Sequence, residues 1–442
     1  MCLITPADLL STFRITPDGA THPRMVPPTK IERFDTRYNR DRRASKPVYH
    51  LEIAMHANSF WVGALAWASL FAVATGNASA DDQSADQTQL QHSDLSQYRA
   101  ADGKLKPIQS VADWMFRRQQ IIAGAELAMG PLPQTEALPA FDTRITEDVW
   151  IGKVRRMTMT MAVDDSDRLP FDLYLPSSVA QFVNVNALTN VISSPKLPAV
   201  VALHPTGAAG KRIVAGQGGR PGRQYGIELA QRGYVVIAPD YPSFGEYADY
   251  DFKRDNYASG TMKAIANHRR CVDYLAELPI VDSERIGAIG HSLGGHNAIF
   301  LGVFDQRVKV MVSSCGWCPF HDYYGGQIEG WASERYMPRL RDEFQLAPDK
   351  VPFDFYELVA AMAPRTFVSV SPTHDANFDI RGVRKAIPVA AQIYSLFDAP
   401  EELILLTPDC EHDFTKNMRM ESYSIIDRVL QHTPIEPEPA TN

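Results

Sequence analysis

The chain has 442 residues, of which 45% are hydrophobic, 22% charged and 10% aromatic. These ordinary globular values exclude a predominantly disordered chain, a collagen-like or coiled-coil protein and a polytopic membrane protein. Lys and Arg number 44 against 52 Asp and Glu, a formal net charge of −8, so the chain lacks an overall basic footprint and no nucleic-acid partner is expected. Five cysteines in a chain of this length exclude a disulfide-dense scaffold.

The N-terminal part of the chain differs from the rest in charge. Residues 1–54 carry nine Lys or Arg and six Asp or Glu, residues 55–80 carry no charge, and the remainder carries about −11. The apolar run 60–74 is followed by Ala78-Ser79-Ala80, as in a signal-peptide core with an A-x-A cleavage site. We therefore expect a signal peptide at 55–80, a mature chain beginning at Asp81, and export to the periplasm or secretion without stable membrane insertion after cleavage. The alternatives for this segment are a retained membrane anchor and a buried core helix, and 1–54 is interpreted as an overextended start or a disordered leader.

The next segments precede the main domain. Residues 81–105 are polar and rich in Asp, Gln and Ser, which predicts a flexible linker. Residues 106–144 are expected to form a helical N-terminal extension, with a helix over 109–129. The inward-facing positions predicted for that helix are Val111, Trp114, Met115, Ile121 and Ile122. The main domain is expected at 145–433, followed by a disordered tail at 434–442.

The main domain alternates between strand-like and helix-like stretches. Strands are predicted at 152–161, 171–175, 198–203, 234–238, 285–289, 308–313, 366–371 and 402–406. Helices are predicted at 224–232, 259–277, 293–304, 355–362, 382–396 and 420–431. Continuously apolar strands separated by helices predict an α/β fold, with a mostly parallel sheet covered by helices on both faces. Residues 178–195 are interpreted as a loop inserted between two strands.

The segment Gly290-His291-Ser292-Leu293-Gly294-Gly295 lies directly after one predicted strand and directly before a predicted helix. A G-x-S-x-G motif in this context is typical of a nucleophile elbow, in which small flanking residues permit a strained turn that exposes the serine hydroxyl. Ser292 is therefore the candidate nucleophile. The backbone N–H of Leu293 is the first candidate donor to an oxyanion, aided by the dipole of the helix that begins there.

A serine hydroxyl needs a base, and in this type of fold the acid and then the histidine follow the serine along the chain. His412 follows the last predicted strand and is the candidate base, whereas His432 lies on or beyond the last helix. The loop after strand 366–371 holds two candidate acids, Asp375 and Asp379. Asp375 is preferred, because Asp379 directly precedes a helical stretch, where aspartate is a favoured N-cap.

The remaining site residues are expected in nearby loops. The loop after strand 198–203 should supply the second oxyanion donor, with Thr206 as first choice and Gly207 as second, while His204 is expected to order this loop. Candidates for the pocket wall are His291, Tyr241, Trp317 and Tyr336, although turn chemistry explains Tyr241 equally well. The pair Cys315 and Cys318 is interpreted as a local disulfide or two buried thiols, because no second pair of metal-ligand spacing accompanies it.

These segments resemble the α/β-hydrolase superfamily, in particular its dienelactone hydrolase-like and acetyl xylan esterase-like branches, over residues 145–433. The resemblance is carried by LHPTG (203–207), RGYVVIAPDYPSFGEY (232–247), RIGAIGHSLGGHNA (285–298), SPTHDANF (371–378) and PDCEHDF (408–414). It implies the α/β-hydrolase fold and serine hydrolysis. Dienelactone hydrolases use a cysteine nucleophile where this chain has Ser292, so their activity is not implied. The prolyl-oligopeptidase branch is also similar around the elbow, but its large β-propeller would not fit in the residues that precede 145.

Taken together, the residues predict a serine hydrolase that cleaves carboxylic esters through a Ser-His-Asp triad and an acyl-enzyme intermediate. The expected substrate is a small-molecule or carbohydrate ester, and the chemistry requires no metal or organic cofactor. The alternatives are a peptidase or amidase of the prolyl-oligopeptidase-like branch, an acyl transferase, and a non-catalytic binding protein with a hydrolase fold. The sequence specifies neither the acyl and alcohol groups nor an oligomeric state.

Overall fold

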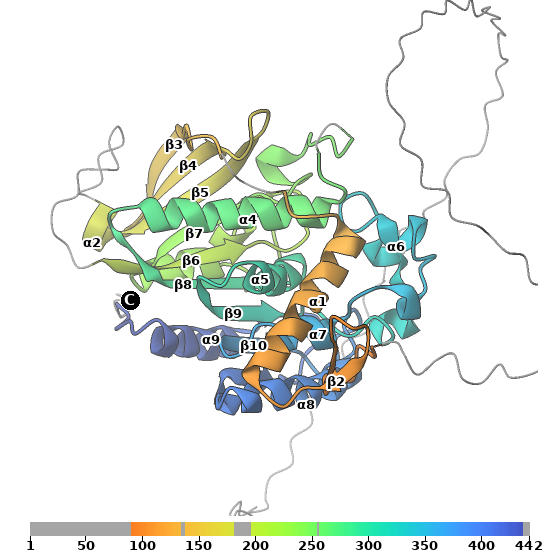
Figure 1. Ribbon diagram of the computed structural model, residues 1–442. Coiled ribbons are helices and arrows are strands. Elements are labelled where there is room, and N and C mark those ends of the chain that lie inside the picture. Colours follow the sequence, from red (N-terminus) through yellow and green to blue (C-terminus); the bar gives the residue numbers. More distant parts are fainter. Residues whose placement is uncertain (1–89, 134–137, 181–195, 254–255, 436–442) are drawn as a thin grey trace, which may run out of the picture. The chain divides into compact units, whose positions relative to one another are not determined.

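A nine-stranded, mostly parallel β-sheet organises the part of the chain that the structure describes (Figure 1). The computed structural model describes residues 90–133, 138–180, 196–253 and 256–435. The strand order is β11-β10-β9-β8-β6-β7-β5-β4-β3, parallel from β11 to β7 and antiparallel from β7 to β3. The strands are β3 (Arg144–Ile151), β4 (Val154–Ala162), β5 (Arg168–Pro176), β6 (Leu197–Leu203), β7 (Val235–Pro239), β8 (Val281–His291), β9 (Val308–Ser314), β10 (Thr366–Val370) and β11 (Leu403–Leu406).

Helices cover both faces of this sheet. They are α1 (Val111–Met129), α2 (Ser177–Ala180), α3 (Tyr225–Gln231), α4 (Gly260–Glu277), α5 (Leu293–Phe304), α6 (Arg339–Asp342), α7 (Phe355–Ala360), α8 (Ile380–Leu396) and α9 (Lys416–Val429). Helices α4, α5 and α8 share one buried apolar cluster with one face of the sheet, and Figure 1 shows α4 and α5 lying in front of the strands. Helices α3 and α9 share a second cluster with the opposite face. The predicted α/β class and the covering of both faces are confirmed.

The buried strands show why the sequence is continuously apolar rather than alternating. In β6, Ala199 and Val201 belong to the cluster on one face, and Val200 and Ala202 belong to the cluster on the other. Successive side chains of a strand point to opposite faces, so a strand covered on both sides must be apolar at every position. Each fully buried valine of this kind contributes roughly 1.5–3 kcal/mol.

The predicted strands all have observed counterparts, but the edge strand β3 was missed. The predicted strand 152–161 corresponds to β4, and β3 precedes it as the antiparallel partner across a turn at Gly152 (φ +60°). Most side chains of β3 are exposed or half-buried. A strand at the edge of a sheet with one solvated face carries too little apolar signal to be identified from hydrophobicity alone.

Helix α1 lies within the predicted helical extension, but its buried face is not the predicted one. Trp114 and Ile121 are buried as expected, whereas Val111 and Met115 are each 39% exposed. The helix is turned so that Arg117 and Arg118 are buried instead. Apolar periodicity could not show this, because charged side chains occupy the inward positions.

The two buried arginines attach α1 to the main domain. Arg117 pairs with Glu357 of α7 at 2.6 Å, with both side chains less than 5% exposed. Arg118 donates to the carbonyl oxygens of Ala361 at 2.9 Å and Val303 at 2.7 Å. A buried charge must be paired or hydrogen-bonded to be tolerated, so these contacts fix how α1 lies on the domain.

The flexible linker predicted for 81–105 is wrong over its described part. Strands β1 (Gln97–Arg99) and β2 (Leu105–Pro107) form an antiparallel pair. Leu95 is buried in the main core, and the His92 ring nitrogen Nδ1 lies 2.8 Å from a Glu357 carboxylate oxygen. A few anchoring side chains are enough to order a polar segment, and composition does not reveal them.

Several predictions fall on residues that the structure does not describe. They are the leader at 1–54, the signal peptide at 55–80, most of the inserted loop at 178–195 and most of the tail at 434–442. Among the described residues, no helix is both long and apolar enough to cross a membrane.

Candidate active site

Ser292 lies in the sharp turn between strand β8 and helix α5. Its backbone has φ +55° and ψ −117°, which is a strained conformation for a residue with a side chain. A Cβ atom at Gly290 would lie 2.1 Å from the carbonyl oxygen of Gly294, and a Cβ atom at Gly294 would lie 2.0 Å from the carbonyl oxygen of Leu203. The glycines of the motif are therefore required by backbone contact, both within the turn and between the turn and β6.

His412 and Asp375 face each other across two loops at the same edge of the sheet. Nδ1 of His412 lies 3.0 and 2.9 Å from the two Asp375 carboxylate oxygens. The Asp375 side chain is only 1% exposed, and its Oδ1 also accepts hydrogen bonds from the backbone N–H groups of Asn377 and Phe378. A carboxylate held in this way fixes the ring orientation of His412 and leaves Nε2 as the nitrogen available to a reacting group.

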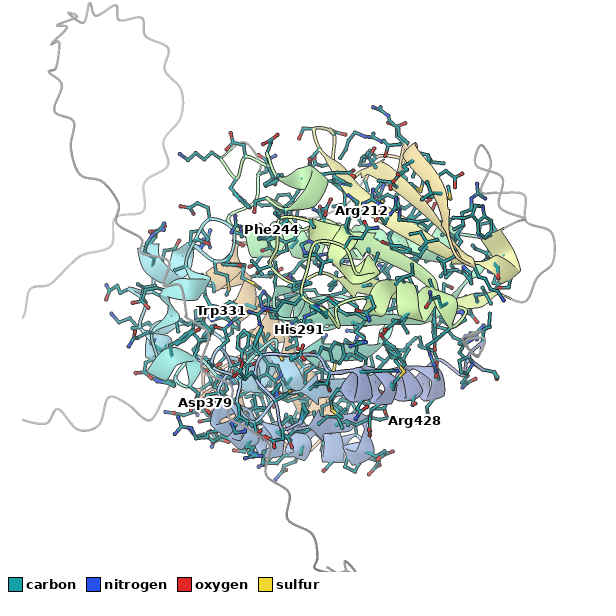
Figure 2. All side chains as sticks on the ribbon, turned by 180° about the vertical axis from the view of Figure 1, so that it is seen from behind. Arg212, Phe244, His291, Trp331, Asp379 and Arg428 are labelled. Carbon is teal, nitrogen blue, oxygen red and sulfur yellow. The ribbon has the colours of Figure 1, made fainter. Side chains whose placement is uncertain are left out.

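Ser292 and His412 line one cleft of about 650 Å³, which we call the Ser292 cleft. Its other lining residues are 205–207, 213, 218–220, 223, 291, 376 and 377. Figure 2 shows the neighbouring His291 near the middle of this side of the molecule, with Phe244 above it and Asp379 below. Within the described chain no hydrogen bond joins the Ser292 hydroxyl to His412, and such bonds in ligand-free sites are often long and tighten when substrate binds.

The backbone N–H groups expected to bind an oxyanion border the same cleft. Leu293 is the first residue of α5, so its N–H has no acceptor within the helix. Thr206 and Gly207 line the cleft on the side of the loop that follows β6. The Tyr225 hydroxyl donates to the carbonyl oxygen of Leu203 at the end of β6, which ties helix α3 to the start of this loop.

A buried ion pair holds the loop after β6 in place. The Asp240 carboxylate accepts hydrogen bonds from the Lys211 backbone N–H at 2.7 Å, from Lys211 Nζ at 2.6 Å and from the Glu246 N–H at 3.0 Å. Both members of the pair are at most 1% exposed. Gly210 has φ +51°, and a Cβ atom there would lie 2.1 Å from an Asp240 carboxylate oxygen. The loop after β6 is thus joined to the loop after β7.

Comparison with known families identifies this arrangement. A model described as the alpha/beta hydrolase family matches residues 200–431, more than half of the chain. The chain belongs to the alpha/beta hydrolase family. The resemblance and the fold expected from the sequence are therefore confirmed.

Curated relatives match this chain over part of their own length. Dipeptidyl-peptidase 5 of Porphyromonas gingivalis is 28% identical over 199 residues, which are 42% of this chain and 26% of the relative. Carbohydrate esterase MZ0003, from an unknown prokaryotic organism, is 25% identical over 189 residues, or 39% of this chain and 42% of the relative. The chain spans about a quarter to just over half of the length of the curated relatives that it matches.

A solved glucuronoyl esterase from Solibacter usitatus is similar to this chain in structure. The TM-score is 0.56 at 18% sequence identity, and the match covers 75% of this chain and 96% of the other. At this identity the likeness shows a shared fold.

Four histidines of this chain, His204, His268, His291 and His296, are buried, and burial favours their neutral form. Burial lowers the pKa of His291 well below its usual value, and the positive charges of Arg223 and Arg220 add to this. Burial also lowers the pKa of His204, and it lowers the pKa values of His268 and His296 to about 3. Among these histidines, only His291 lines the Ser292 cleft.

His204 orders the loop after β6, as the sequence analysis expected. Its Nδ1–H donates to the Pro205 carbonyl oxygen at 2.7 Å, and its Nε2 accepts from the Tyr241 N–H at 2.9 Å. The hydrogen-bond pattern requires the neutral ring, in agreement with the lowered pKa.

Three residues predicted for the pocket wall do not line the cleft. Trp317 is buried in the core and donates its indole N–H to Ser369 Oγ at 2.9 Å. Tyr241 is buried with its hydroxyl donating to the Arg335 carbonyl oxygen, and Tyr336 packs beside it. The aromatic content of a loop does not reveal whether its side chains point to the core or to a cleft.

The alternative acid, Asp379, instead caps α8 and accepts a hydrogen bond from the Arg381 N–H.

The cysteines of the C-x-x-C segment are both free and buried, which corresponds to the buried-thiol interpretation. Cys315 Sγ, His412 and Asp375 have potential ligand atoms within 4.8 Å of one another. His412 and Asp375 are already hydrogen-bonded to each other, and burial raises the pKa of the Cys315 thiol. A protonated thiol is a poor metal ligand, so this donor set suits proton transfer better than cation binding.

Sequence reasoning missed the two arginines that line the Ser292 cleft, Arg220 and Arg223. Both lie in the stretch GQGGRPGR at 216–223, which follows the predicted oxyanion loop after residues 211–215. A glycine-rich stretch with two arginines at this point of the chain was the available signal. Arg223 donates to the His412 carbonyl oxygen at 3.4 Å and pairs with Asp413 at 2.5 Å.

Proposed function

We propose that this hydrolase cleaves carboxylic esters through an acyl-enzyme intermediate, with Ser292 as nucleophile, His412 as base and Asp375 as the acid that orients the base. The observation that carries the proposal is the shared cleft. Ser292 stands in a strained turn, and it lines that cleft together with His412, whose ring is oriented by Asp375. A nucleophile beside a base that a third group orients is the arrangement that activates a serine hydroxyl.

The proposed reaction has two halves. His412 Nε2 takes the Ser292 hydroxyl proton while Oγ attacks the ester carbonyl carbon, and the C–O bond to the alcohol then breaks as His412 protonates the leaving oxygen. In the second half His412 takes a proton from water as the water oxygen attacks the acyl carbon. The bond from that carbon to Ser292 Oγ then breaks, His412 returns the proton to Oγ, and the acid is released. Asp375 remains ionised and stabilises the imidazolium formed in each half.

The negative charge on the carbonyl oxygen is stabilised by backbone donors. We assign the N–H of Leu293 and, from the loop after β6, the N–H of Thr206 or Gly207. A donor of this kind typically contributes roughly 2.7–4 kcal/mol to the stabilisation of the transition state. The buried pair Lys211–Asp240 keeps the loop at this place, so that the donor needs no rearrangement during the reaction.

Carbohydrate esters are the substrate class that we propose. The relative named carbohydrate esterase MZ0003 and the glucuronoyl esterase from Solibacter usitatus share the family or the fold with this chain. The cleft volume of about 650 Å³ lies within the range of roughly 300–1,000 Å³ typical of small-molecule sites. A peptidase is the second candidate function, because this chain is also similar to dipeptidyl-peptidase 5, over 199 residues.

The proposal is tested with a panel of acetylated sugars, uronate methyl esters, aryl esters and peptide anilides. The full chain is compared with the variants Ser292→Ala and Asp375→Asn. We expect Ser292→Ala to lose more than 99% of ester turnover and Asp375→Asn to lower kcat about 10⁴-fold, as the loss of the correct histidine tautomer does in such triads. Faster turnover of the anilides than of every ester would favour the peptidase.

Asp379→Asn is the matched control for the acid. Asparagine caps a helix about as well as aspartate, so this variant tests the alternative acid without disturbing α8. We expect it to keep the activity of the unmodified chain. If Asp379→Asn lost most of the activity and Asp375→Asn kept it, Asp379 rather than Asp375 would be the acid that orients His412.

We also propose export directed by residues 55–80, an assignment that rests on the sequence pattern alone. N-terminal sequencing of protein recovered from outside the cytoplasm should begin at Asp81. A start elsewhere, or retention of the chain in the cytoplasm, would contradict it.

A further inference from the structure

Arg220 carries an uncompensated positive charge in the Ser292 cleft. It is exposed and lines the cleft together with Ser292 and His412. Within the part of the chain that the structure describes, its guanidinium has no ion-pair or hydrogen-bond partner. The other exposed or half-exposed arginines near the cleft are engaged, as Arg212 is with Glu147 and Asp172. An unpaired arginine in the lining of the cleft that holds the nucleophile is therefore available to a bound molecule.

The lining of the Ser292 cleft contains no acidic side chain that could neutralise Arg220. Among its 13 lining residues two are arginines, and neither aspartate nor glutamate occurs. Arg223 is 4% exposed and already pairs with Asp413. The nearby carboxylate of Asp375 lies behind His412 and is 1% exposed. The net character of the accessible cleft is therefore positive, and positive clefts attract anionic ligands.

The loop that carries Arg220 is closely packed on both sides, at Gly218 and at Gly222. Gly218 has φ +67°, and a Cβ atom there would lie 2.6 Å from Ala209 Cβ in the oxyanion loop. Gly222 has φ +83°, and a Cβ atom there would lie 3.1 Å from Arg419 Nη1 and 3.3 Å from the Phe414 carbonyl oxygen. Residues 218–222 are thus placed between the oxyanion loop and the loop of His412. The segment that carries Arg220 therefore lies next to both of these loops.

We propose that the Ser292 cleft selects esters that carry a second, free carboxylate, which Arg220 binds. The guanidinium group presents paired N–H donors whose geometry matches a carboxylate, and this makes arginine the suitable partner for such a group. The proposal rests on the proposed esterase function and names its substrate class. Arg220 acts in it as a specificity-determining residue and takes no part in the proton transfers.

The test compares matched pairs of esters that differ only in charge. One pair, monoethyl adipate and ethyl adipamate, places the carboxylate or its neutral amide on the acyl side. The other pair, 4-acetoxybutanoate and 4-acetoxybutanamide, places it on the alcohol side. For each pair, the ratio of kcat/KM for the anionic ester to that for the neutral ester is measured by pH-stat titration at low and high salt.

The full chain is compared with Arg220→Gln, Arg220→Lys and the control Arg144→Gln. Arg144 lies on the edge strand β3 with a 64% exposed side chain, so its substitution removes the same charge away from the cleft. We expect a ratio of at least ten in one of the pairs, decreasing with salt because exposed charges are screened. Arg220→Gln should lower that ratio at least five-fold, Arg220→Lys should lower it less, and Arg144→Gln should leave it unchanged.

Ratios near one in both pairs would overturn the proposal, and so would equal ratios in the unmodified chain and Arg220→Gln. Either outcome leaves the esterase function intact as long as the neutral esters are hydrolysed in a Ser292-dependent way. Failure of the proposed function has a different signature, since none of the four esters would then be hydrolysed.

Discussion

Ser292, Asp375 and His412 come from three separate loops, and the sheet brings these loops together. The loops follow β8, β10 and β11, which are parallel strands whose carboxyl ends lie at the same edge. Ligand sites of open α/β sheets form at this edge. The order of these residues along the chain could be predicted from the sequence, whereas the Asp375–His412 contact depends on loop conformations that only the structure provides.

Arg223 is the residue that we expect to position His412. Its buried guanidinium joins the His412 carbonyl oxygen, the Asp413 carboxylate and the Pro221 carbonyl oxygen. Arg223→Gln removes the ion pair and frees the loop of His412. Since misplacement by about 1 Å can cost 10²-fold in rate, we expect kcat on a neutral ester to fall at least ten-fold with a smaller change in KM.

Two further variants separate positioning from general stability. Arg223→Lys should restore part of kcat, because lysine can still pair with Asp413. Arg118→Gln removes an equally buried arginine that donates to Ala361 and Val303 away from the cleft, so it should lower Tm without lowering kcat. If Arg223→Gln retained the kcat of the unmodified chain, the positioning role would be wrong.

At the scale of elements, the contact between the elbow and strand β6 decides where the nucleophile stands. Gly294 of α5 abuts the backbone of Leu203 at the end of β6, and Ser292 N–H donates to the Ser314 carbonyl oxygen at the end of β9 at 2.8 Å. The motif therefore joins three strands and a helix. Its strand–turn–helix context could be predicted from the sequence because every local signal agreed with the fold.

Gly294→Ala should displace the elbow from β6. A backbone carbonyl cannot move aside as a side chain can, so we expect a loss of about 3 kcal/mol in unfolding free energy and most of the esterase activity. Gly302→Ala is the control in the same helix, where a Cβ atom would meet the flexible side chains of Met311 and Met362. Urea unfolding should show a clearly smaller loss of unfolding free energy in Gly302→Ala than in Gly294→Ala, since alanine also forms helices better than glycine. Equal losses in the two variants would show that the contact with Leu203 is not decisive.

At the scale of the whole molecule, buried neutral histidines should make stability depend on pH. His268 is buried on α4, and burial lowers its pKa to about 3, below the usual value of 6.5. Between these two values the unfolded chain binds a proton that the folded chain does not, so stability is present above pH 6.5 and is lost as the pH falls. Each such histidine contributes a slope of roughly 1 kcal/mol per pH unit.

The slope can be measured by urea unfolding of the full chain at pH 5, 6 and 7. His268→Gln should reduce the slope of the unfolding free energy against pH by about 1 kcal/mol per pH unit, because one fewer proton is then taken up on unfolding. Asn267→Ala, at the neighbouring buried position on α4, should lower stability at every pH without changing the slope. An unchanged slope in His268→Gln would contradict the neutral state of this side chain.

How much of the structure can be predicted from the sequence depends on whether a feature is encoded by neighbouring residues or by contacts between distant ones. Buried strands, amphipathic helices and the elbow motif are encoded locally, and they were predicted closely. The inward arginines of α1, the ordered segment around Leu95 and the core position of Trp317 depend on contacts between distant residues. The same holds for Arg220, whose place in the Ser292 cleft results from the packing of a glycine-rich loop between two others.

The central claim is that Ser292 is an activated nucleophile, and covalent labelling tests it most directly. The full chain and Ser292→Ala are treated with a fluorophosphonate, and the adducts are located by mass spectrometry of the peptides. We expect one adduct, on the peptide that contains Ser292, with much slower labelling in Asp375→Asn and none in Ser292→Ala. An unlabelled Ser292 in the unmodified chain, or equal labelling of Ser292→Ala, would contradict it.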